Sequence, residues 1–254
     1  MVFDLICPAF PKHVMLLQRP QINCDLGEGI PFESLIYPWI DRANLACGGH
    51  YGDEATLSAS LSLAKEAGVL VGAHPSYPDR ENFGRKSLKI TFPDLSDSIN
   101  SQISLFQRMT KEADLEMAHI KFHGALYNDA ASNAEFADFL TDLVGERYPN
   151  VPLFVPPYSE IEKLARHKKL AFIREIFGDR SYENNYGLSP RSYPDSLLTR
   201  LDQVERHLQA ILEKDQITSR TGIPLPVTAE TICFHGDNPG LMNFLPQIRK
   251  KYWP

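Results

Sequence analysis

The sequence is poor in cysteine, lacks long apolar runs and carries no concentrated positive charge. Its 254 residues hold four cysteines, Cys7, Cys24, Cys47 and Cys233, whose irregular spacing indicates reduced thiols rather than a disulfide framework. No apolar run approaches the roughly 18 residues of a membrane span, and residues 1–20 lack the features of a secretory signal. The net charge of −6, without a basic run, argues against nucleic acid and anionic membranes as partners. We therefore expect a cytoplasmic protein that acts on a small molecule.

Several standard motifs for nucleotide binding and hydrolysis are also absent. The sequence contains no GxxxxGK(S/T) phosphate loop, no GxGxxG turn after a strand, no HExxH zinc motif and no GxSxG nucleophile turn. A nucleotide, if the reaction uses one, must therefore bind by other means or on a partner.

Apolar, strand-like runs alternate with helical patterns along the chain. The runs lie near residues 22–24, 43–47, 69–73, 117–121, 153–155, 171–176 and 231–234. They show little polar alternation, as expected for parallel strands buried on both faces. The pattern predicts a seven-stranded parallel α/β barrel as the single catalytic domain of residues 21–254, with an open doubly wound sheet as the alternative. Residues 1–20, which contain Pro8, Pro11 and Pro20, are a predicted N-terminal extension.

Three helices have clear sequence signals. The first is predicted over residues 53–68, with Asp53 as its cap and a glycine at its end. The second is predicted over residues 94–113, with Asp94 as its cap, and the third over residues 195–212. Each has its apolar residues along one stripe, so we expect these helices to pack on a sheet.

Four of the strand-like runs are followed by a histidine among small and ionisable residues. The segments are CGGHYGD at 47–53, GAHPSYPDR at 72–80, HIKFHG at 119–124 and CFHGD at 233–237. In a parallel barrel the loops after the strands converge on one face and build one active site. We therefore expect four catalytic histidines to surround one point, namely His50, His74, His123 and His235.

Further ionisable residues are predicted to join these histidines. The two-residue period of a strand places His119, Lys121 and His123 on one face. His119 also fits a hydrogen-bonded core residue, and Lys121 a salt bridge at the end of the barrel. Asp25 and Glu28 follow the first strand beside two glycines and can bind a metal or act as a base, although Asp25 also fits the cap of a turn. We assign Asp25, Glu28 and Lys121 to the catalytic group.

The remaining candidates are suited to substrate binding. Arg80 and Arg85 can hold a carboxylate through two parallel hydrogen bonds, with surface salt bridging as the alternative. His235 paired with Asp237 can form an acid/base unit. The substrate-binding candidates are Asn44, Arg80, Arg85, Arg191 and Asp237. Three further ionisable residues lie at the end of another strand, namely Glu175, Asp179 and Arg180. Ion pairing within their loop explains them as well as a role in the site does.

The chain resembles the LamB/YcsF family, the A subunit of bacterial ATP-dependent 5-oxoprolinase. The resemblance runs in order from about residue 22 to residue 240 through NCDLGEG, NLACGGHYGDE, GAHPSYPDRENFGR, HIKFHGALYN, GDRSY with SPR, and TICFHGD. It implies a barrel of the glycoside hydrolase/deacetylase type, partner subunits B and C, and a reaction in which 5-oxo-L-proline, ATP and water give L-glutamate, ADP and phosphate. The chain departs from the family pattern at Gly49, where a larger residue is usual, at Phe122, which replaces a proline, and at Ser181, which replaces a glycine.

The implied reaction suggests a role for each candidate. A five-membered lactam is a stabilised amide, so its hydrolysis needs activation by phosphoryl transfer to the ring oxygen. We hypothesise that Asp25 or Glu28 orients the attacking water as base. His50 or His74 would assist this carboxylate. Lys121 and His123 would stabilise the developing negative charge, and His235 would protonate the leaving nitrogen.

Two other functions are compatible with the sequence. Asp25, His50 and His74 can ligate one divalent metal ion, and the chain would then be a metal-dependent deacetylase or other C–N hydrolase that acts without ATP. The lack of a phosphate loop is also compatible with a noncatalytic subunit that holds the substrate for an ATP-using partner.

Overall fold

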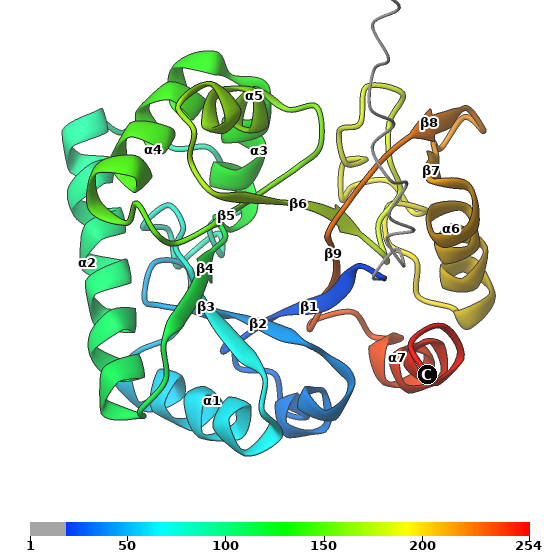
Figure 1. Ribbon diagram of the computed structural model, residues 1–254, viewed down its shortest axis with the longest axis horizontal. Coiled ribbons are helices and arrows are strands. Elements are labelled where there is room, and N and C mark those ends of the chain that lie inside the picture. The colour runs from blue at the N-terminus through cyan, green and yellow to red at the C-terminus, as the bar shows by residue number, and fades with distance from the viewer. Residues whose placement is uncertain (1–18) are drawn as a thin grey trace, which may run out of the picture.

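The computed structural model describes residues 19–254, so Cys7 and nearly all of the expected extension over residues 1–20 lie outside it. Parallel strands close into a barrel in the order β1-β2-β3-β4-β5-β6-β9 (Figure 1). These strands are Gln21–Leu26 (β1), Arg42–Ala46 (β2), Leu70–His74 (β3), Met117–Ile120 (β4), Leu153–Val155 (β5), Phe172–Phe177 (β6) and Thr231–His235 (β9). Each predicted strand-like run overlaps one of them, and the predicted seven-stranded parallel α/β barrel is confirmed.

The barrel closes between its first and last strands. β1 pairs with β2 on one side and with β9 on the other, so Asp25 lies between Asn44 and His235 in the register of the sheet. Asn44 lies on β2, whose residues from Ala43 onward are fully buried. Because all the strands run the same way, their carboxyl ends meet at one end of the barrel, where loops from distant parts of the chain come together.

The backbone stays extended beyond the end of β4. The amide of Lys121 donates to the carbonyl of Ala73 at 3.0 Å, and the amide of His123 donates to the carbonyl of Pro75 at 2.9 Å. This pairing continues the strand alternation past Ile120, and the Lys121 and His123 side chains are both buried on the inside. The predicted common face is therefore present, although the strand itself ends earlier than expected.

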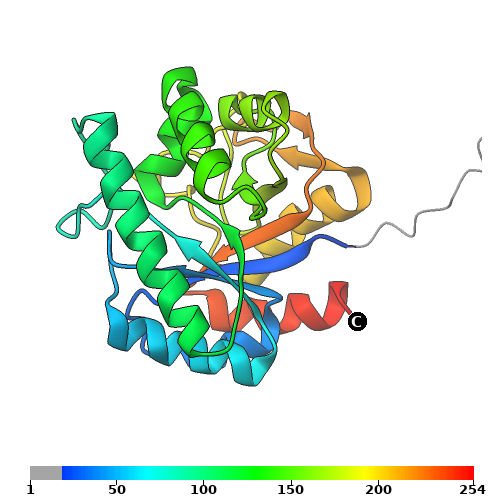
Figure 2. The same ribbon diagram turned by 60° about the vertical axis from the view of Figure 1, so that its left-hand side comes forward.

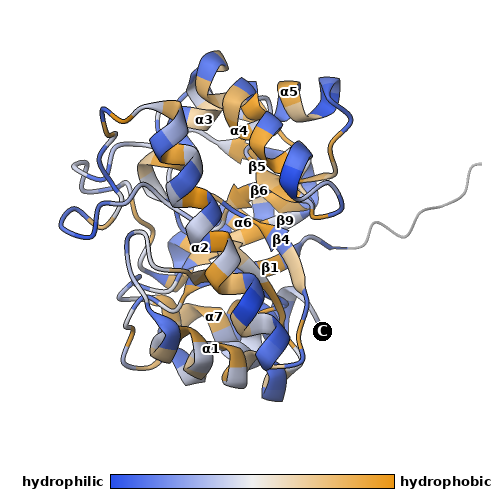
Figure 3. Cartoon of the chain, turned by 90° about the vertical axis from the view of Figure 1, so that its left-hand side faces the viewer, coloured by the Kyte–Doolittle hydropathy of each residue, from blue (hydrophilic) through white to orange (hydrophobic). Residues whose placement is uncertain are grey.

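Helices surround the barrel (Figures 1 and 2). Figure 3 shows hydrophilic and hydrophobic bands along these helices, and the side chains of Leu95, Ile99 and Phe106 on α2 are fully buried. The helices are Glu54–Ala67 (α1), Phe92–Glu112 (α2), Gly124–Ser132 (α3), Ala134–Arg147 (α4), Glu160–His167 (α5), Leu201–Lys214 (α6) and Leu241–Tyr252 (α7), and two short 3-10 helices span Glu33–Leu35 (η1) and Tyr37–Trp39 (η2).

Two of the predicted helix starts can be compared with the capping side chains. Asp53 caps α1, because its Oδ1 accepts a hydrogen bond from the Thr56 amide at 2.9 Å, and Gly68 ends the helix with a φ of 67°, as predicted. The predicted start of α2 at Asp94 is wrong. Thr91 is the cap, and its hydroxyl accepts a hydrogen bond from the Asp94 amide, so Asp94 lies within the first turn.

The chain between β6 and β9 differs most from the prediction. The third predicted helix begins at Leu201 rather than at residue 195, because Leu197 pairs with Arg180 and the Leu198 amide donates to the Asp179 carbonyl at 2.8 Å. These backbone groups are therefore not available to a helix. An antiparallel hairpin that was not predicted, Gln216–Thr218 (β7) and Pro224–Pro226 (β8), follows α6.

The cysteines and the apolar content of the helices can be examined directly in the described residues. Cys24, Cys47 and Cys233 are buried with free thiols, and burial raises the pKa of each, so all three stay protonated at neutral pH. Within residues 19–254 no helix is both long and apolar enough to cross a membrane.

Candidate active site

The carboxyl ends of the strands open into a cavity of about 320 Å³, near the lower end of the range of about 300 to 1,000 Å³ for small-molecule sites. Its wall contains seven of the residues predicted from the sequence, namely Asp25, His74, Arg85, Lys121, His123, Arg191 and His235. Glu28 and His50 lie behind this wall, where both contact His123. Asn44, Arg80 and Asp237 do not line the cavity.

Lys121 lies among acidic groups in the barrel interior. Its Nζ is 2.7 Å from Asp25 Oδ1, 3.0 Å from Glu175 Oε1 and 3.0 Å from Cys233 Sγ. Burial opposes the charge on Lys121 and on Asp25, but their attraction holds the pKa of Lys121 well above, and that of Asp25 well below, its ordinary value. Burial raises the pKa of Glu175. Lys121 therefore forms the buried salt bridge that the sequence allowed and also lines the cavity.

A chain of amide and imidazole groups lies next to Asp25. Asn44 Nδ2 donates to Asp25 Oδ1 at 2.8 Å and to Asn23 Oδ1 at 2.7 Å, while Asn44 Oδ1 accepts from His119 Nε2 at 2.6 Å. Burial lowers the pKa of His119 well below its ordinary value, so its ring is neutral. Asn44 and His119 therefore belong to the interior of the barrel and orient Asp25, rather than facing the cavity.

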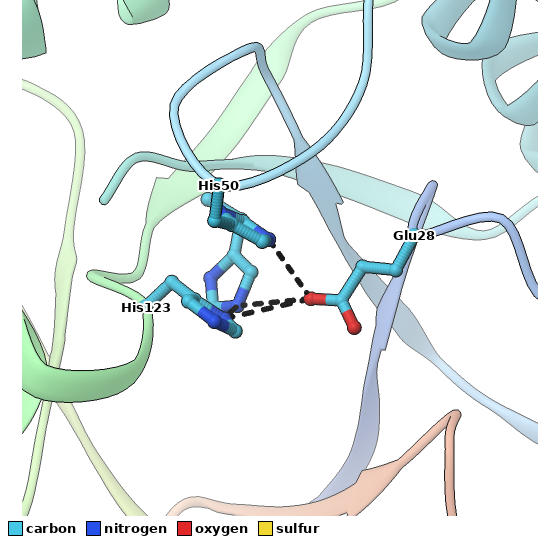
Figure 4. Close-up of side chains that lie close together, drawn as sticks. Glu28, His50 and His123 are labelled. Carbon is cyan, nitrogen blue, oxygen red and sulfur yellow. Dashed lines mark hydrogen bonds and ion pairs between the residues drawn. The ribbon is translucent and has the colours of Figure 1, made fainter. Parts of the chain in front are cut away.

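Glu28 and three of the predicted histidines form a buried cluster. Glu28 Oε1 is 3.0 Å from His50 Nε2, 3.5 Å from His123 Nδ1 and 3.9 Å from His74 Nε2. Figure 4 shows the Glu28 carboxylate directed towards the rings of His50 and His123. One ligand atom from each of the four residues lies within 4.8 Å of the others, so the cluster can hold a metal ion.

The ionisation of this cluster reflects its burial. Burial is the main cause that raises the pKa of Glu28 to about 7, and the negative charge of Asp25 adds to it. Burial also lowers the pKa of His50 and of His123 well below the ordinary value. Neutral imidazoles can bind a metal ion or accept a proton, and a carboxyl group that ionises near neutral pH can give or take a proton there.

Two glycines allow the loops to approach this cluster. Gly29 has a φ of 76°, and a Cβ atom there would lie 2.2 Å from the Tyr51 hydroxyl. Gly84 has a φ of 62°, and its Cβ atom would lie 3.0 Å from His50 Cβ and 3.1 Å from a ring carbon of His123. The positive φ favours glycine at both positions, and a side chain at residue 84 would crowd His50 and His123.

The metal ligands predicted from the sequence, Asp25, His50 and His74, do not all contact one another. Asp25 Oδ2 is 3.5 Å from His74 Nε2, whereas His50 contacts Glu28. Asp25 Oδ1 is already hydrogen-bonded to Lys121 and Asn44. Glu28 is therefore better placed than Asp25 to share an ion with the imidazoles.

His235 is paired with a different acid from the one predicted. Its Nδ1 is 2.8 Å from Asp179 Oδ1, and Asp179 Oδ2 also accepts the His235 amide at 3.0 Å and Asn238 Nδ2 at 2.9 Å. Electrostatic attraction to His235, together with these hydrogen bonds, lowers the pKa of Asp179 despite its burial. The predicted His235–Asp237 unit is wrong, because the chain turns away after Gly236 and Asp237 instead meets Arg85 Nη2 at 2.6 Å. His235 keeps its predicted place on the cavity wall.

Three arginines line one part of the cavity. Arg85 and Arg191 share Asp237, at 2.6 and 3.7 Å, and both side chains are about one-third exposed. Arg180 is different, because it is buried and donates only to the carbonyls of Ser189 at 2.7 Å and Ser196 at 2.9 Å. It forms no salt bridge with any residue in the described part of the chain. Burial, with the positive charge of Arg191, lowers its pKa to about 10.

Arg80 has a structural contact in place of the predicted substrate contact. Its Nη2 donates to the Gly48 and Gly52 carbonyls and so holds the loop that carries His50. Its side chain does not reach the cavity wall.

Comparison with known proteins identifies the family. Residues 21–252 match the LamB/YcsF family. The chain belongs to this family. Members named as the A subunit of 5-oxoprolinase include one from Neisseria meningitidis serogroup A, 34% identical over 92% of this chain and 96% of its own, and one from Vibrio cholerae, 34% identical over 90% and 96%.

The fold is also similar to that of solved structures. The crystal structure of a lactam utilization protein from Thermus thermophilus superimposes with a TM-score of 0.82 at 31% identity, covering 92% of this chain and 95% of that one. A GH113 β-1,4-mannanase shares only the fold, with a TM-score of 0.52 at 14% identity. The expected barrel of the glycoside hydrolase/deacetylase type is therefore confirmed.

Three residues of the site were not selected from the sequence, namely Glu175, Asp179 and Arg180. All three lie in REIFGDR at the end of β6. This segment repeats the pattern of the four selected ones, a buried strand followed by glycine and ionisable residues, and lacks only the histidine. The pattern without the histidine was therefore the signal that could have found them.

Proposed function

We propose that this chain opens the lactam ring of 5-oxo-L-proline to give L-glutamate, as the A subunit of a cytoplasmic, ATP-dependent 5-oxoprolinase that also contains subunits B and C. The observation that carries the proposal is 34% identity, over 92% of this chain, to a protein named as the A subunit of 5-oxoprolinase. The charges of the cavity fit the same substrate.

5-Oxoproline has a carboxylate on one side of the ring and a cyclic amide on the other. Arg180, Arg85 and Arg191 line one part of the cavity and suit the carboxylate. Asp25, Lys121 and His235 line another part and suit the amide. Arg180 has no ionic partner among the described residues, so a bound carboxylate would supply the missing negative charge.

The acidic and basic groups can divide the reaction between them. Asp25 is ionised, and it can accept a proton from the attacking water. Lys121 is positively charged and can stabilise negative charge on the lactam oxygen or on a phosphoryl group attached to it. His235, held by Asp179, can deliver a proton to the ring nitrogen as the C–N bond breaks. The phosphoryl group then remains on the new side-chain carboxyl group as an acyl phosphate, and a second water molecule hydrolyses it to phosphate and L-glutamate.

ATP enters the proposal through the partners. The sequence has no phosphate loop, and the lactam oxygen needs a phosphoryl group to make its carbon reactive. Subunits B and C are proposed to supply the nucleotide-binding groups.

The assay that tests this function measures L-glutamate and ADP released from 5-oxoproline by the purified chain combined with subunits B and C. We expect both products in equal amounts when all three subunits and ATP are present. We expect loss of glutamate when this chain is left out. Unchanged glutamate release by B and C alone would contradict the proposal.

A metal-dependent C–N hydrolase that needs no ATP is the second candidate, and the Glu28 and histidine cluster favours it. The same assay separates the two functions. Glutamate formed from 5-oxoproline by this chain with a divalent metal but without ATP would support the hydrolase. A strict need for ATP would exclude it for this substrate.

Arg180→Gln is expected to raise the KM for 5-oxoproline by about 10- to 100-fold, the effect of losing a charge-assisted hydrogen bond. The measurement is the steady-state rate of the assembled complex. Arg108→Gln, an exposed arginine on α2 that pairs with Glu54 and Glu112, is the matched control and should leave KM unchanged.

The lactam 2-pyrrolidinone, which lacks the carboxylate, distinguishes binding from loop structure. If Arg180 binds the carboxylate, the loss seen with 5-oxoproline should disappear with 2-pyrrolidinone. An equal loss with both lactams would show that Arg180 acts only by holding the carbonyls of Ser189 and Ser196.

A further inference from the structure

We infer that Glu28, His74 and His123 form a binding site for one divalent transition-metal ion, of the Zn²⁺ type, beside the cavity. The three ligand atoms are His74 Nε2, His123 Nδ1 and Glu28 Oε1, and they lie 2.9, 3.5 and 3.9 Å apart. The circumcentre of this triangle is about 2.0 Å from each atom, which is the usual Zn–N and Zn–O distance of about 2.0 to 2.2 Å. One ion at this point would lie within coordination distance of all three atoms.

The outer nitrogens of the two rings fix their tautomers. His74 Nδ1 is 2.8 Å from the Lys121 carbonyl, and His123 Nε2 is 3.0 Å from the Phe83 carbonyl. A carbonyl oxygen only accepts hydrogen bonds, so both of these nitrogens carry the proton. If each ring carries only that one proton, the inner nitrogens, His74 Nε2 and His123 Nδ1, each have an unprotonated lone pair. These two nitrogens lie 2.9 Å apart.

Two facing lone pairs repel each other unless a cation lies between or beside them. An outer N–H that donates to a backbone carbonyl is also the usual arrangement for metal-binding histidines, because it fixes the ring and makes the inner nitrogen more basic. Both rings show it. A single proton shared by the two inner nitrogens is the other possible occupant, and metal titration distinguishes it from an ion.

His50 has a different role from the two ligand histidines. Its ring is stacked on that of His123, with centroids 3.6 Å apart and an angle of 3° between the planes. An imidazole binds a metal in the plane of its ring, so two stacked rings do not share one ion. His50 Nε2 instead contacts Glu28 Oε1 at 3.0 Å and positions this carboxylate.

The ligand set indicates the kind of metal and its access. Two imidazole nitrogens with one carboxylate suit Zn²⁺ and neighbouring transition metals better than Mg²⁺ or Ca²⁺, which prefer oxygen ligands. His74 and His123 both line the cavity, so an ion bound there would lie at the cavity wall. An ion at this place would supply Lewis acidity to the proposed ring-opening reaction.

This role rests on the proposed function, but metal binding is measured without substrate, so the two can fail separately. Untagged protein is stripped with a chelator and titrated with Zn²⁺ by calorimetry, and bound metal is then counted by elemental analysis. We expect one ion per chain. Wild-type protein that binds no Zn²⁺ would overturn the inference whatever the variants do.

Variants test the ligand assignment. His74→Gln, His123→Gln and Glu28→Gln should each weaken Zn²⁺ binding by at least about 100-fold, and His50→Gln by about 10- to 100-fold with the stoichiometry unchanged. His167→Gln, at an exposed histidine of α5, is the matched control and should bind as the wild type does. Circular dichroism checks that each variant is folded. Full affinity in folded Glu28→Gln or His123→Gln would overturn the assignment.

Discussion

Lys121→Met should reduce kcat of the assembled complex by about 10³-fold, because it removes the positive charge directed at the reacting oxygen. Methionine keeps most of the side-chain length, so the cavity should not collapse. The measurement is glutamate release at saturating 5-oxoproline and ATP. Lys163→Met, at an exposed lysine of α5, is the control and should keep the wild-type rate.

The same variant should lose stability, since Lys121 is the shared partner of Asp25 and Glu175 at 2.7 and 3.0 Å. Removing one member of a buried ion pair costs about 3 to 5 kcal/mol. Denaturant unfolding of the chain measures this loss. Adding Glu175→Gln to Lys121→Met removes one of the two unpaired carboxylates and should recover part of the free energy of unfolding.

The double variant also separates chemistry from stability. We expect it to stay as inactive as Lys121→Met, because the ammonium group is still missing. Recovery of turnover together with stability would show that Lys121 acts only by holding the barrel interior together.

Asp25→Asn should lower kcat by about 10³-fold, within the range of about 10² to 10⁴ for loss of a general base. The amide has the same shape but does not accept the proton of the attacking water. It also leaves Lys121 with Glu175 as its only carboxylate neighbour within the described residues. KM should change much less than kcat, and the steady-state rates of the complex measure both.

The matched control is Asp53→Asn, an exposed aspartate that caps α1. Asparagine caps a helix as well as aspartate does, so both stability and turnover should stay close to wild type. If Asp25→Asn kept the wild-type kcat, Asp25 would be no more than the counter-ion of Lys121.

The barrel was predictable because its strands are buried on both faces. Seven apolar runs were sufficient to place β1 to β6 and β9, and the alternation in HIKFHG placed Lys121 and His123 on the inside. The hairpin β7 and β8 was missed, since PLP contains two prolines in a three-residue strand. The start of α6 was missed because Leu197 lies at helical spacing from Leu201, whereas the backbone of residues 197–198 pairs with residues 179–180.

The sequence predicted that the site lies at the ends of the strands. It did not predict which side chains of the site contact each other. Periodicity tells which side chains point inward, and it carries no information about which strand lies across the barrel. His235 therefore seemed to belong with Asp237, two residues away, whereas its partner Asp179 is 56 residues away and reaches it only when β6 and β9 pair. The contact between Lys121 and Glu175 likewise depends on closure of the barrel.

The most direct test of this account is a crystal structure of the chain with 5-oxo-L-proline bound. We predict that the lactam lies in the cavity at the strand ends, with its carboxylate at Arg180 and its ring amide facing Asp25 and Lys121. A lactam bound elsewhere on the chain, or in this cavity with its carboxylate away from Arg180 and its amide away from Lys121, would contradict the account.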